Sequence, residues 1–216
     1  MGAQLPSGAR IPFSHPTQEG TGMTTATADH VRRLPKVELH CHLEGSTRAT
    51  TVADLARKNG VELPVDNPED LYKFTNLNQF LDIYTVMCRS FVSADDFRRI
   101  TYEALEDAVA AGVRYREMFF SPGFTMSFGV PIETIWDGIR AGLLEARQDL
   151  DIQARMILDF DKPSGPEHAV AMAEFAGSQP DRDLLIGMGA DSVESGIDHT
   201  AFAPAYEVAR NRGLRR

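Results

Sequence analysis

The fold is decided by the stretch Leu34-Pro35-Lys36-Val37-Glu38-Leu39-His40-Cys41-His42-Leu43-Glu44-Gly45-Ser46. Residues 37–43 alternate apolar and polar side chains and stop at Gly45-Ser46, a pattern typical of a strand that ends in a turn. Side chains two apart on a strand point to the same face, so His40 and His42 are expected to converge, and two neutral imidazoles so placed suit zinc. For the bare tripeptide an accidental polar pair is the better interpretation. Its place on the first strand of a βα series favours the metal site.

Alternating strand and helix signals continue after this stretch. Strands are predicted at 37–43, 113–120, 152–159 and 184–189, with helices after them from Ser46, from Pro131, at 166–176 and at 199–212. Residues 66–112 are predicted to be a mostly helical insertion between the first two strands, with Ser93 capping its second helix. Four strand-then-helix units predict a parallel sheet with helices outside it.

Such a sheet is either an open doubly wound sheet or part of a barrel. No Gly-rich phosphate loop follows the first strand, so a dinucleotide-binding sheet has little support. A complete (β/α)8 barrel needs roughly 250 residues. Residues 34–216 are therefore predicted to be an α/β domain of (β/α)8 TIM-barrel type. About the first four βα units are expected, with a helical insertion after the first.

The composition limits which binding partners and which cellular location the protein is expected to have. The formal net charge is −9 and Lys and Arg form no run, which argues against nucleic acid and anionic membranes as partners. Cys41 and Cys88 form no CxxC pair, which favours a cytoplasmic location. No apolar run approaches the length of a membrane span. Residues 1–33 lack the apolar region of a secretory signal and are predicted to be a disordered leader.

The opening stretch resembles the signature of the adenosine deaminase family, P-K-x-E-L-H-x-H-L-[DE]-G. The resemblance is dense over residues 34–46 and continues more loosely, with residues 112–117 and Ser121-Pro122 resembling the family's second strand. It implies a (β/α)8 barrel that uses Zn²⁺ to hydrolyse the exocyclic amine of adenosine or a related aminopurine. Another metal-dependent amidohydrolase would share the histidine pair, although Leu43-Glu44-Gly45 fits the deaminases better.

The resemblance also assigns residues to the site. It implies that His40 and His42 are zinc ligands, that Glu44 accepts a hydrogen bond from a ribose hydroxyl, and that Gly45 lies against the substrate. The alternative for Glu44 is a solvated carboxylate near a helix N-terminus. Ser192 stands where the family has a Gly beside the purine, and Phe119 where it often has Arg. These two departures weaken the case for adenosine itself and leave the deamination of some aminated heterocycle.

The remaining machinery of the family lies on later strands. A His-Ala-Gly-Glu segment supplies the third zinc histidine and the catalytic Glu, and both are expected beyond residue 216. His168 and His199 lie near predicted helix starts and are expected at the surface. This chain is therefore predicted to be inactive by itself. The alternative is a non-catalytic half-barrel that binds a ligand or partner, with self-association through exposed sheet edges.

Overall fold

The computed structural model of the protein describes residues 27–216, without the side chains of residues 77 and 78. Most of the predicted leader therefore lies outside the described residues. Its last part is not irregular: Ala28–Arg33 forms helix α1, whose N-terminus is capped by the hydroxyl of Thr27. No residue of α1 is buried, so this helix adds little to the core.

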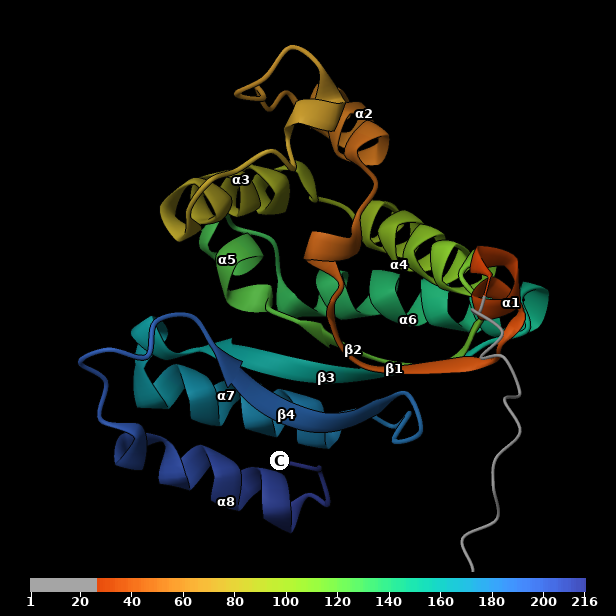
Figure 1. Cartoon of the computed structure of the whole chain (residues 1–216). Coiled ribbons are helices and arrows are strands. Elements are labelled where there is room, and N and C mark those ends of the chain that lie inside the picture. Colours follow the sequence, from red (N-terminus) through yellow and green to blue (C-terminus); the bar gives the residue numbers. More distant parts are fainter. Residues whose placement is uncertain (1–26) are drawn as a thin grey trace, which may run out of the picture.

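A parallel four-stranded sheet forms the centre of the molecule (Figure 1). Its strands are β1 (Lys36–His42), β2 (Val113–Phe120), β3 (Gln153–Asp161) and β4 (Leu185–Asp191). They pair in the order β1-β2-β3-β4, each parallel to the next, which confirms the predicted α/β architecture. Because the strands are parallel, their carboxyl ends meet at one edge of the sheet, where barrel enzymes carry their active sites.

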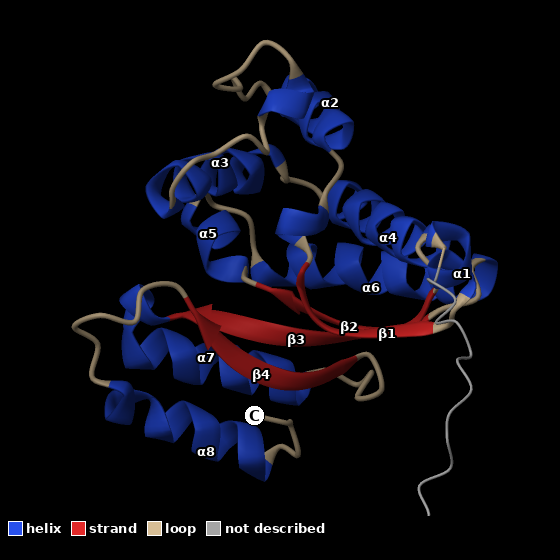
Figure 2. Cartoon of the chain, in the orientation of Figure 1, coloured by secondary structure: helices blue, strands red, loops and turns tan. Residues whose placement is uncertain are grey.

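Helices connect and cover the strands. Figure 2 shows α4 beside α6 and α7 beside α8; the two helices of each pair contact each other, and each helix contacts the sheet. The helices after α1 are α2 (Ala49–Asn59), α3 (Leu77–Ser90), α4 (Ala94–Ala110), α5 (Pro122–Ser127), α6 (Ile132–Asp149), α7 (Gly165–Ser178) and α8 (Ala203–Asn211). Short 3-10 turns occupy Glu44–Ser46, Pro68–Asp70, Lys162–Ser164 and His199–Phe202. The helical insertion expected at residues 66–112 thus contains α3 and α4.

Four local details differ from the sequence-based expectations. Ser46 does not cap α2; it lies in a 3-10 turn and its hydroxyl donates to the His42 carbonyl at 2.8 Å. Pro131 is the N-cap of α6 and not its first helical residue. The helix expected at 199–212 is divided into a 3-10 turn and α8, and α5 was not predicted. Ser93 does cap α4, in a reciprocal capping box with Asp96.

Neighbouring side chains of β2 point to opposite faces of the sheet: one face packs on the helices, and the other holds the site. Phe120 is fully buried and stacks on Trp136 of α6, with ring centroids 6.0 Å apart. Phe119 points the other way and lies against the histidine rings of β1. The two-residue period of a strand therefore directs one aromatic side chain to the core and its neighbour to the site.

The chain returns to the sheet after α8. The N–H of Arg215 donates to the carbonyl of Ile186 at 2.9 Å, and the N–H of Met188 donates to the carbonyl of Arg215 at 2.9 Å. The bridge is parallel, so Arg215 occupies the free edge of β4. By the family resemblance, the next strand of the barrel is expected to begin about here. Across residues 27–216 no helix is long and apolar enough to cross a membrane.

Candidate active site

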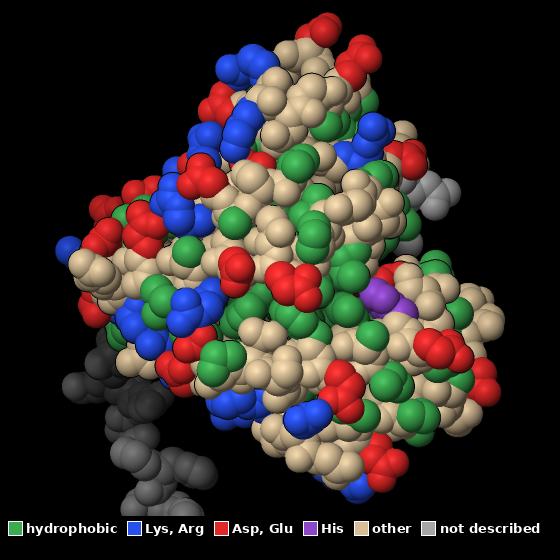
Figure 3. Space-filling view, turned by 180° about the vertical axis from the view of Figure 1, so that it is seen from behind, with side chains coloured by type: hydrophobic (Ala, Val, Ile, Leu, Met, Phe, Trp, Pro, Cys, Tyr) green, Lys and Arg blue, Asp and Glu red, His purple; other side chains and the backbone are tan. Residues whose placement is uncertain are grey.

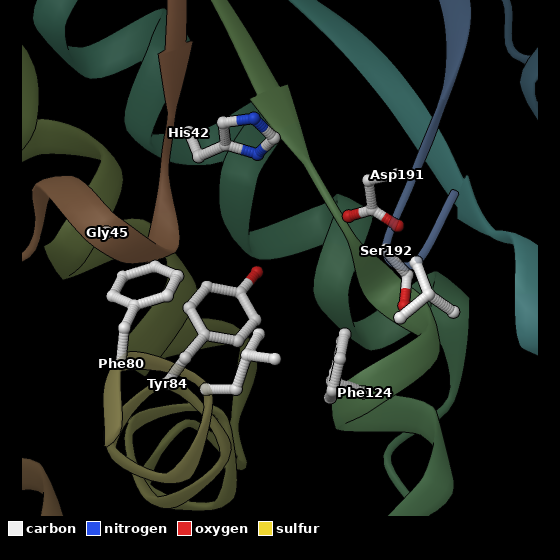
Figure 4. Close-up of a pocket in the computed structure, with 9 residues that line it drawn as sticks. His42, Gly45, Phe80, Tyr84, Phe124, Asp191 and Ser192 are labelled. Carbon is white, nitrogen blue, oxygen red and sulfur yellow. The ribbon is translucent and has the colours of Figure 1, made fainter. Parts of the chain in front are cut away.

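A cavity of about 320 Å³ opens at the carboxyl end of the sheet, between β1, β4, α3 and α5 (Figure 4). One part of its wall is polar and comes from the strand ends, while the part contributed by the two helices is apolar. In the surface view the histidine side chains on that face gather at one spot beside hydrophobic ones (Figure 3). The lining residues are His42, Gly45, Phe80, Leu81, Tyr84, Phe124, Asp191, Ser192 and Val193.

The two histidines of β1 face the same side, as the alternation predicts. Their ring centroids are 5.6 Å apart, and the Phe119 ring lies 4.4 Å from that of His40 and 5.5 Å from that of His42. His40 is exposed, whereas His42 is half-buried and lines the cavity. Burial, with a smaller effect of the neighbouring His40, lowers the pKa of His42. A lowered pKa keeps the imidazole neutral near pH 7, the state in which it binds metals.

Two aspartates from other strands meet His42. A ring nitrogen of His42 and one carboxylate oxygen from each of Asp159 and Asp191 lie within 4.8 Å of one another. These residues come from β1, β3 and β4, so the strand order brings them together. No motif in the sequence marks either aspartate. Their proximity depends on the sheet's order and register, which local patterns do not give.

The environment of both aspartates opposes ionisation. Burial raises the pKa of Asp159 to about 8, and the negative charges of Asp191 and Glu44 act in the same direction. Burial also raises the pKa of Asp191, against the opposing effect of the Ser121 hydroxyl, which donates to its Oδ2. In both residues Oδ1 is buried and has no hydrogen-bond partner within residues 27–216. The site therefore holds two carboxyl oxygens free to accept a proton or a cation.

Glu44 lies beneath the cavity and does not line it. The residue is 3% exposed, and its Oε1 accepts a hydrogen bond from the backbone N–H of Ser121 at 2.9 Å. Burial raises the pKa of Glu44 to about 7, although the bond from Ser121 lowers it. The interpretation as a solvated carboxylate is wrong. Because Tyr84 also approaches this buried carboxyl, Glu44 joins β1, α3 and the end of β2 into one wall.

Gly45 and Ser192 line the cavity, at the positions where substrate contact was expected. The backbone of Ser192 has a φ of 72°. Among the described residues, every other residue with a positive φ is a glycine. A left-handed conformation costs an L-residue roughly 1–2 kcal/mol, which glycine avoids. A glycine, which the family resemblance expects here, would take this conformation freely. In this chain a serine takes it, and its side chain lies at the cavity beside Asp191 (Figure 4).

The other two histidines differ from each other. The side chain of His199 is 57% exposed, as predicted. The prediction was wrong for His168, whose side chain is only 19% exposed and whose Nε2 lies 3.3 Å from Asp161 Oδ1. Burial raises the pKa of Asp161, but the interactions with His168 and Ser164 outweigh it and leave the pKa below its ordinary value. This pair lies beside the cavity without lining it.

Comparisons with known proteins agree with this arrangement. The family described as adenosine deaminase matches residues 35–216. An adenine deaminase of Cupriavidus pinatubonensis is 40% identical over 192 residues, which make up 88% of this chain and 54% of that protein. The chain thus spans about half the length of the curated relatives it matches.

Two solved structures share the fold and show how much of it this chain covers. The adenine deaminase of Arthrobacter aurescens has a TM-score of 0.75 and 32% identity, over 83% of this chain and 55% of that one. An amidohydrolase from Burkholderia ambifaria, solved with bound Zn, has a TM-score of 0.80 and 34% identity, over 90% of this chain and 55% of that one. The order of the strands, the histidine pair at the end of β1 and the match over residues 35–216 place this chain in the adenosine deaminase family.

Proposed function

We propose that this chain forms the β1–β4 part of a zinc-dependent deaminase whose substrate is a free aminopurine base such as adenine. The observation that carries the substrate class is the position of Glu44, which the family resemblance expected to accept a ribose hydroxyl. Its carboxyl is buried against the Ser121 N–H and is absent from the cavity wall. The cavity volume of about 320 Å³ is at the lower end for ligand pockets, which suits a base without its sugar.

The walls of the cavity suit a planar aromatic ring. Phe80, Tyr84 and Phe124 present aromatic side chains from α3 and α5 (Figure 4). Tyr84 and Phe124 meet edge to face with ring centroids 5.3 Å apart, which fixes both rings. These groups exclude water from the side of the base opposite the strand ends. The polar groups of His42 and Asp191 then face the edge of the ring.

The residues present fit a zinc ion in their chemistry. A neutral imidazole and carboxylate oxygens are zinc ligands, and the buried Oδ1 atoms of Asp159 and Asp191 have no other partner. The family resemblance assigns the metal to His40 and His42, which remains a proposal for this chain. When bound, zinc supplies an activated water near neutral pH. The protein's own part is to hold His42 neutral and to orient the base against the strand ends.

We also propose that these 216 residues do not turn over substrate alone, because they contain no His-Ala-Gly-Glu segment. Binding of the base without turnover is the second candidate function, that of a non-catalytic half-barrel. Self-association is supported by Val37 and Leu39 on the outer strand β1, which are 65% and 57% exposed. A cytoplasmic location is supported by Cys41 and Cys88, which are free thiols. The absence of nucleic-acid and membrane partners stays a prediction.

The test compares this chain with the product of the whole open reading frame from which it is read. We expect the longer product, loaded with zinc, to release ammonia from adenine much faster than from adenosine. The 216-residue chain should bind adenine in calorimetry without releasing ammonia. Equal rates on adenine and adenosine would refute the assignment of a free base. Absence of both zinc binding and purine turnover in the longer product would refute its assignment as a deaminase. A ring amide is assayed as well, because its hydrolysis would instead indicate another metal-dependent amidohydrolase.

A further inference from the structure

We infer that Tyr84 restricts the site to a free base, because its hydroxyl occupies the Glu44 carboxyl that a ribose hydroxyl would otherwise need. This role rests on the proposed function and deepens it, since it names the residue that determines specificity. Tyr84 belongs to α3 and lies outside the histidine signature of β1. It acts on the choice of substrate and leaves the metal to the histidine pair.

The side chain of Tyr84 borders both the cavity and the buried carboxyl of Glu44. Tyr84 is 7% exposed and lines the cavity, and Figure 4 shows its hydroxyl pointing from α3 towards the strand ends. Gly45 also lines the cavity, but the adjacent Glu44 is 3% exposed and does not. A ligand in the cavity therefore meets the tyrosine, and the carboxyl of Glu44 is out of its reach.

The hydroxyl of Tyr84 approaches the Glu44 carboxyl as a donor. Burial raises the pKa of Glu44, and the contact with the Tyr84 hydroxyl is one of the interactions that lower it. Burial also raises the pKa of Tyr84, and the negative charge of Glu44 acts in the same direction, so the phenol keeps its proton. The Ser121 N–H donates to Glu44 Oε1 at 2.9 Å. The protein thus supplies donors where the family resemblance expects one from the substrate.

Packing fixes the ring that carries this hydroxyl. The ring centroid of Tyr84 lies 5.9 Å from that of Phe80, one turn earlier on α3. The ring of Phe124 on α5 meets it edge to face at 5.3 Å. A tyrosine has only two side-chain torsions, so its hydroxyl is held in one place at low entropic cost. A sugar hydroxyl reaches Glu44 only if these packed rings move.

A carboxyl that already has its donors discriminates against a nucleoside. The sugar hydroxyl would replace an existing contact of Glu44 and would leave the Tyr84 hydroxyl without its acceptor, which costs free energy in a buried place. A base without its sugar makes no such demand. The discrimination therefore comes from an unfavourable effect on the wrong substrate, in addition to the small volume of the cavity.

The first test compares adenine and adenosine as substrates of the zinc-loaded product of the whole open reading frame. In Tyr84→Phe we expect the ratio of kcat/KM for adenosine to that for adenine to rise by about 10-fold or more, as for one hydrogen bond to a charged group. Tyr84→Ala, which also removes the ring, should raise the ratio further. The matched control is Leu81→Ala, an apolar residue of α3 that lines the same cavity. It should leave the ratio within about 3-fold, less than one such bond.

The second test measures the contact without any substrate, by a double-mutant cycle in urea unfolding of the 216-residue chain. Tyr84→Phe leaves the carboxyl without this donor, and Glu44→Met leaves the hydroxyl without its acceptor. The double variant leaves neither unpaired with the other, so the two effects should be coupled by about 3-fold or more in the unfolding equilibrium constant. Deamination is not a readout here, so failure of the contact and failure of the deaminase are scored separately.

Three results would overturn the role of Tyr84. Additive effects in the cycle would show that Tyr84 and Glu44 do not interact. An unchanged substrate ratio in Tyr84→Phe, with adenine still preferred, would keep the free-base assignment and remove Tyr84 as its cause. A shift in Tyr84→Ala alone would assign the exclusion to the bulk of the ring. Circular dichroism checks the fold of each variant, and Tyr84→Phe carries the test if Tyr84→Ala unfolds.

Discussion

Replacing Asp96 tests how the helical wall of the cavity is held in place. Its side chain is fully buried at the junction of α3 and α4. Its oxygens accept hydrogen bonds from the backbone N–H groups of Val92 and Ser93, each at 3.0 Å, from Lys58 Nζ at 2.6 Å and from Asn59 Nδ2 at 3.0 Å. One carboxylate therefore joins the end of α2 to the turn that directs α3 over the site.

The cost of Asp96→Ala follows from these four contacts. Truncation leaves two backbone donors and an ammonium without their acceptor, at about 1–3 kcal/mol for each buried donor. Lys58 is half exposed and regains water, so its share is small. We expect a loss of about 3 kcal/mol in the free energy of unfolding at pH 7, near the lower bound for breaking a buried ion pair. Asp96→Asn keeps the shape and should lose less.

The loss should depend on pH in a defined direction. Burial raises the pKa of Asp96, but its hydrogen bonds from Lys58 and the backbone outweigh this and leave the pKa below its ordinary value. A carboxyl whose pKa is lower in the folded state stabilises the protein above its unfolded pKa, about 4. That contribution disappears as the pH falls through the folded pKa. Asp96→Ala should therefore flatten the loss of stability in acid.

Urea unfolding at pH 7 and near pH 3 measures both effects. The control is Asp95→Asn, because the Asp95 side chain is 69% exposed and forms an ion pair with Arg98 at 2.9 Å on the surface of α4. An exposed pair of this kind contributes less than about 1 kcal/mol. An Asp96→Ala variant within 0.5 kcal/mol of the unmodified chain, a margin of about one weak hydrogen bond, would refute the reasoning. The same large loss at both pH values would refute the electrostatic part of it.

Three further substitutions test the packing and the backbone. Phe120→Ala removes a fully buried ring stacked on Trp136 and should cost about 3–5 kcal/mol by thermal or urea unfolding, and a smaller loss would show that the core collapses to fill the space. Gly138→Ala places a Cβ against the backbone of α4 and should cost about 1–3 kcal/mol. Gly45→Ala, where an added Cβ meets nothing within 4 Å, should cost less, and equal losses would contradict the steric explanation. Ser192→Gly should leave the melting temperature equal or higher, since it relieves φ 72°, and a clear decrease would show that the serine side chain stabilises the rim.

The sheet was predictable because strands carry their own signal. Residues 113–120 were predicted as a strand, and β2 spans those same residues, since its buried and exposed side chains alternate along the chain. The capping box at the start of α4 is equally local, so Ser93 was correct. Helix α5 was missed because its apolar residues lie within a six-residue segment, too short to show a helical period.

The site was only half predictable for a physical reason. The pair His40 and His42 is separated by one residue, so a single strand brings both rings to one face. Asp159 and Asp191 approach His42 only through the order and register of three strands, which no local pattern states. The burial of Glu44 was not foreseen, because its partner, the Ser121 N–H, is 77 residues away in the chain. Burial created by distant partners is invisible in a short motif.

The strand order has a consequence for how the protein is made. Each strand pairs with the one that precedes it in the sheet order and in the chain, so every strand after β1 finds its partner already synthesised. Lys36 nevertheless pairs with Val113, far along the chain, and parallel pairing across such a separation forms slowly. On the ribosome each new strand and helix would dock on a sheet that already exists, at the edge now held by Arg215. The aspartates of β3 and β4 would then reach His42 in the order in which they leave the exit tunnel.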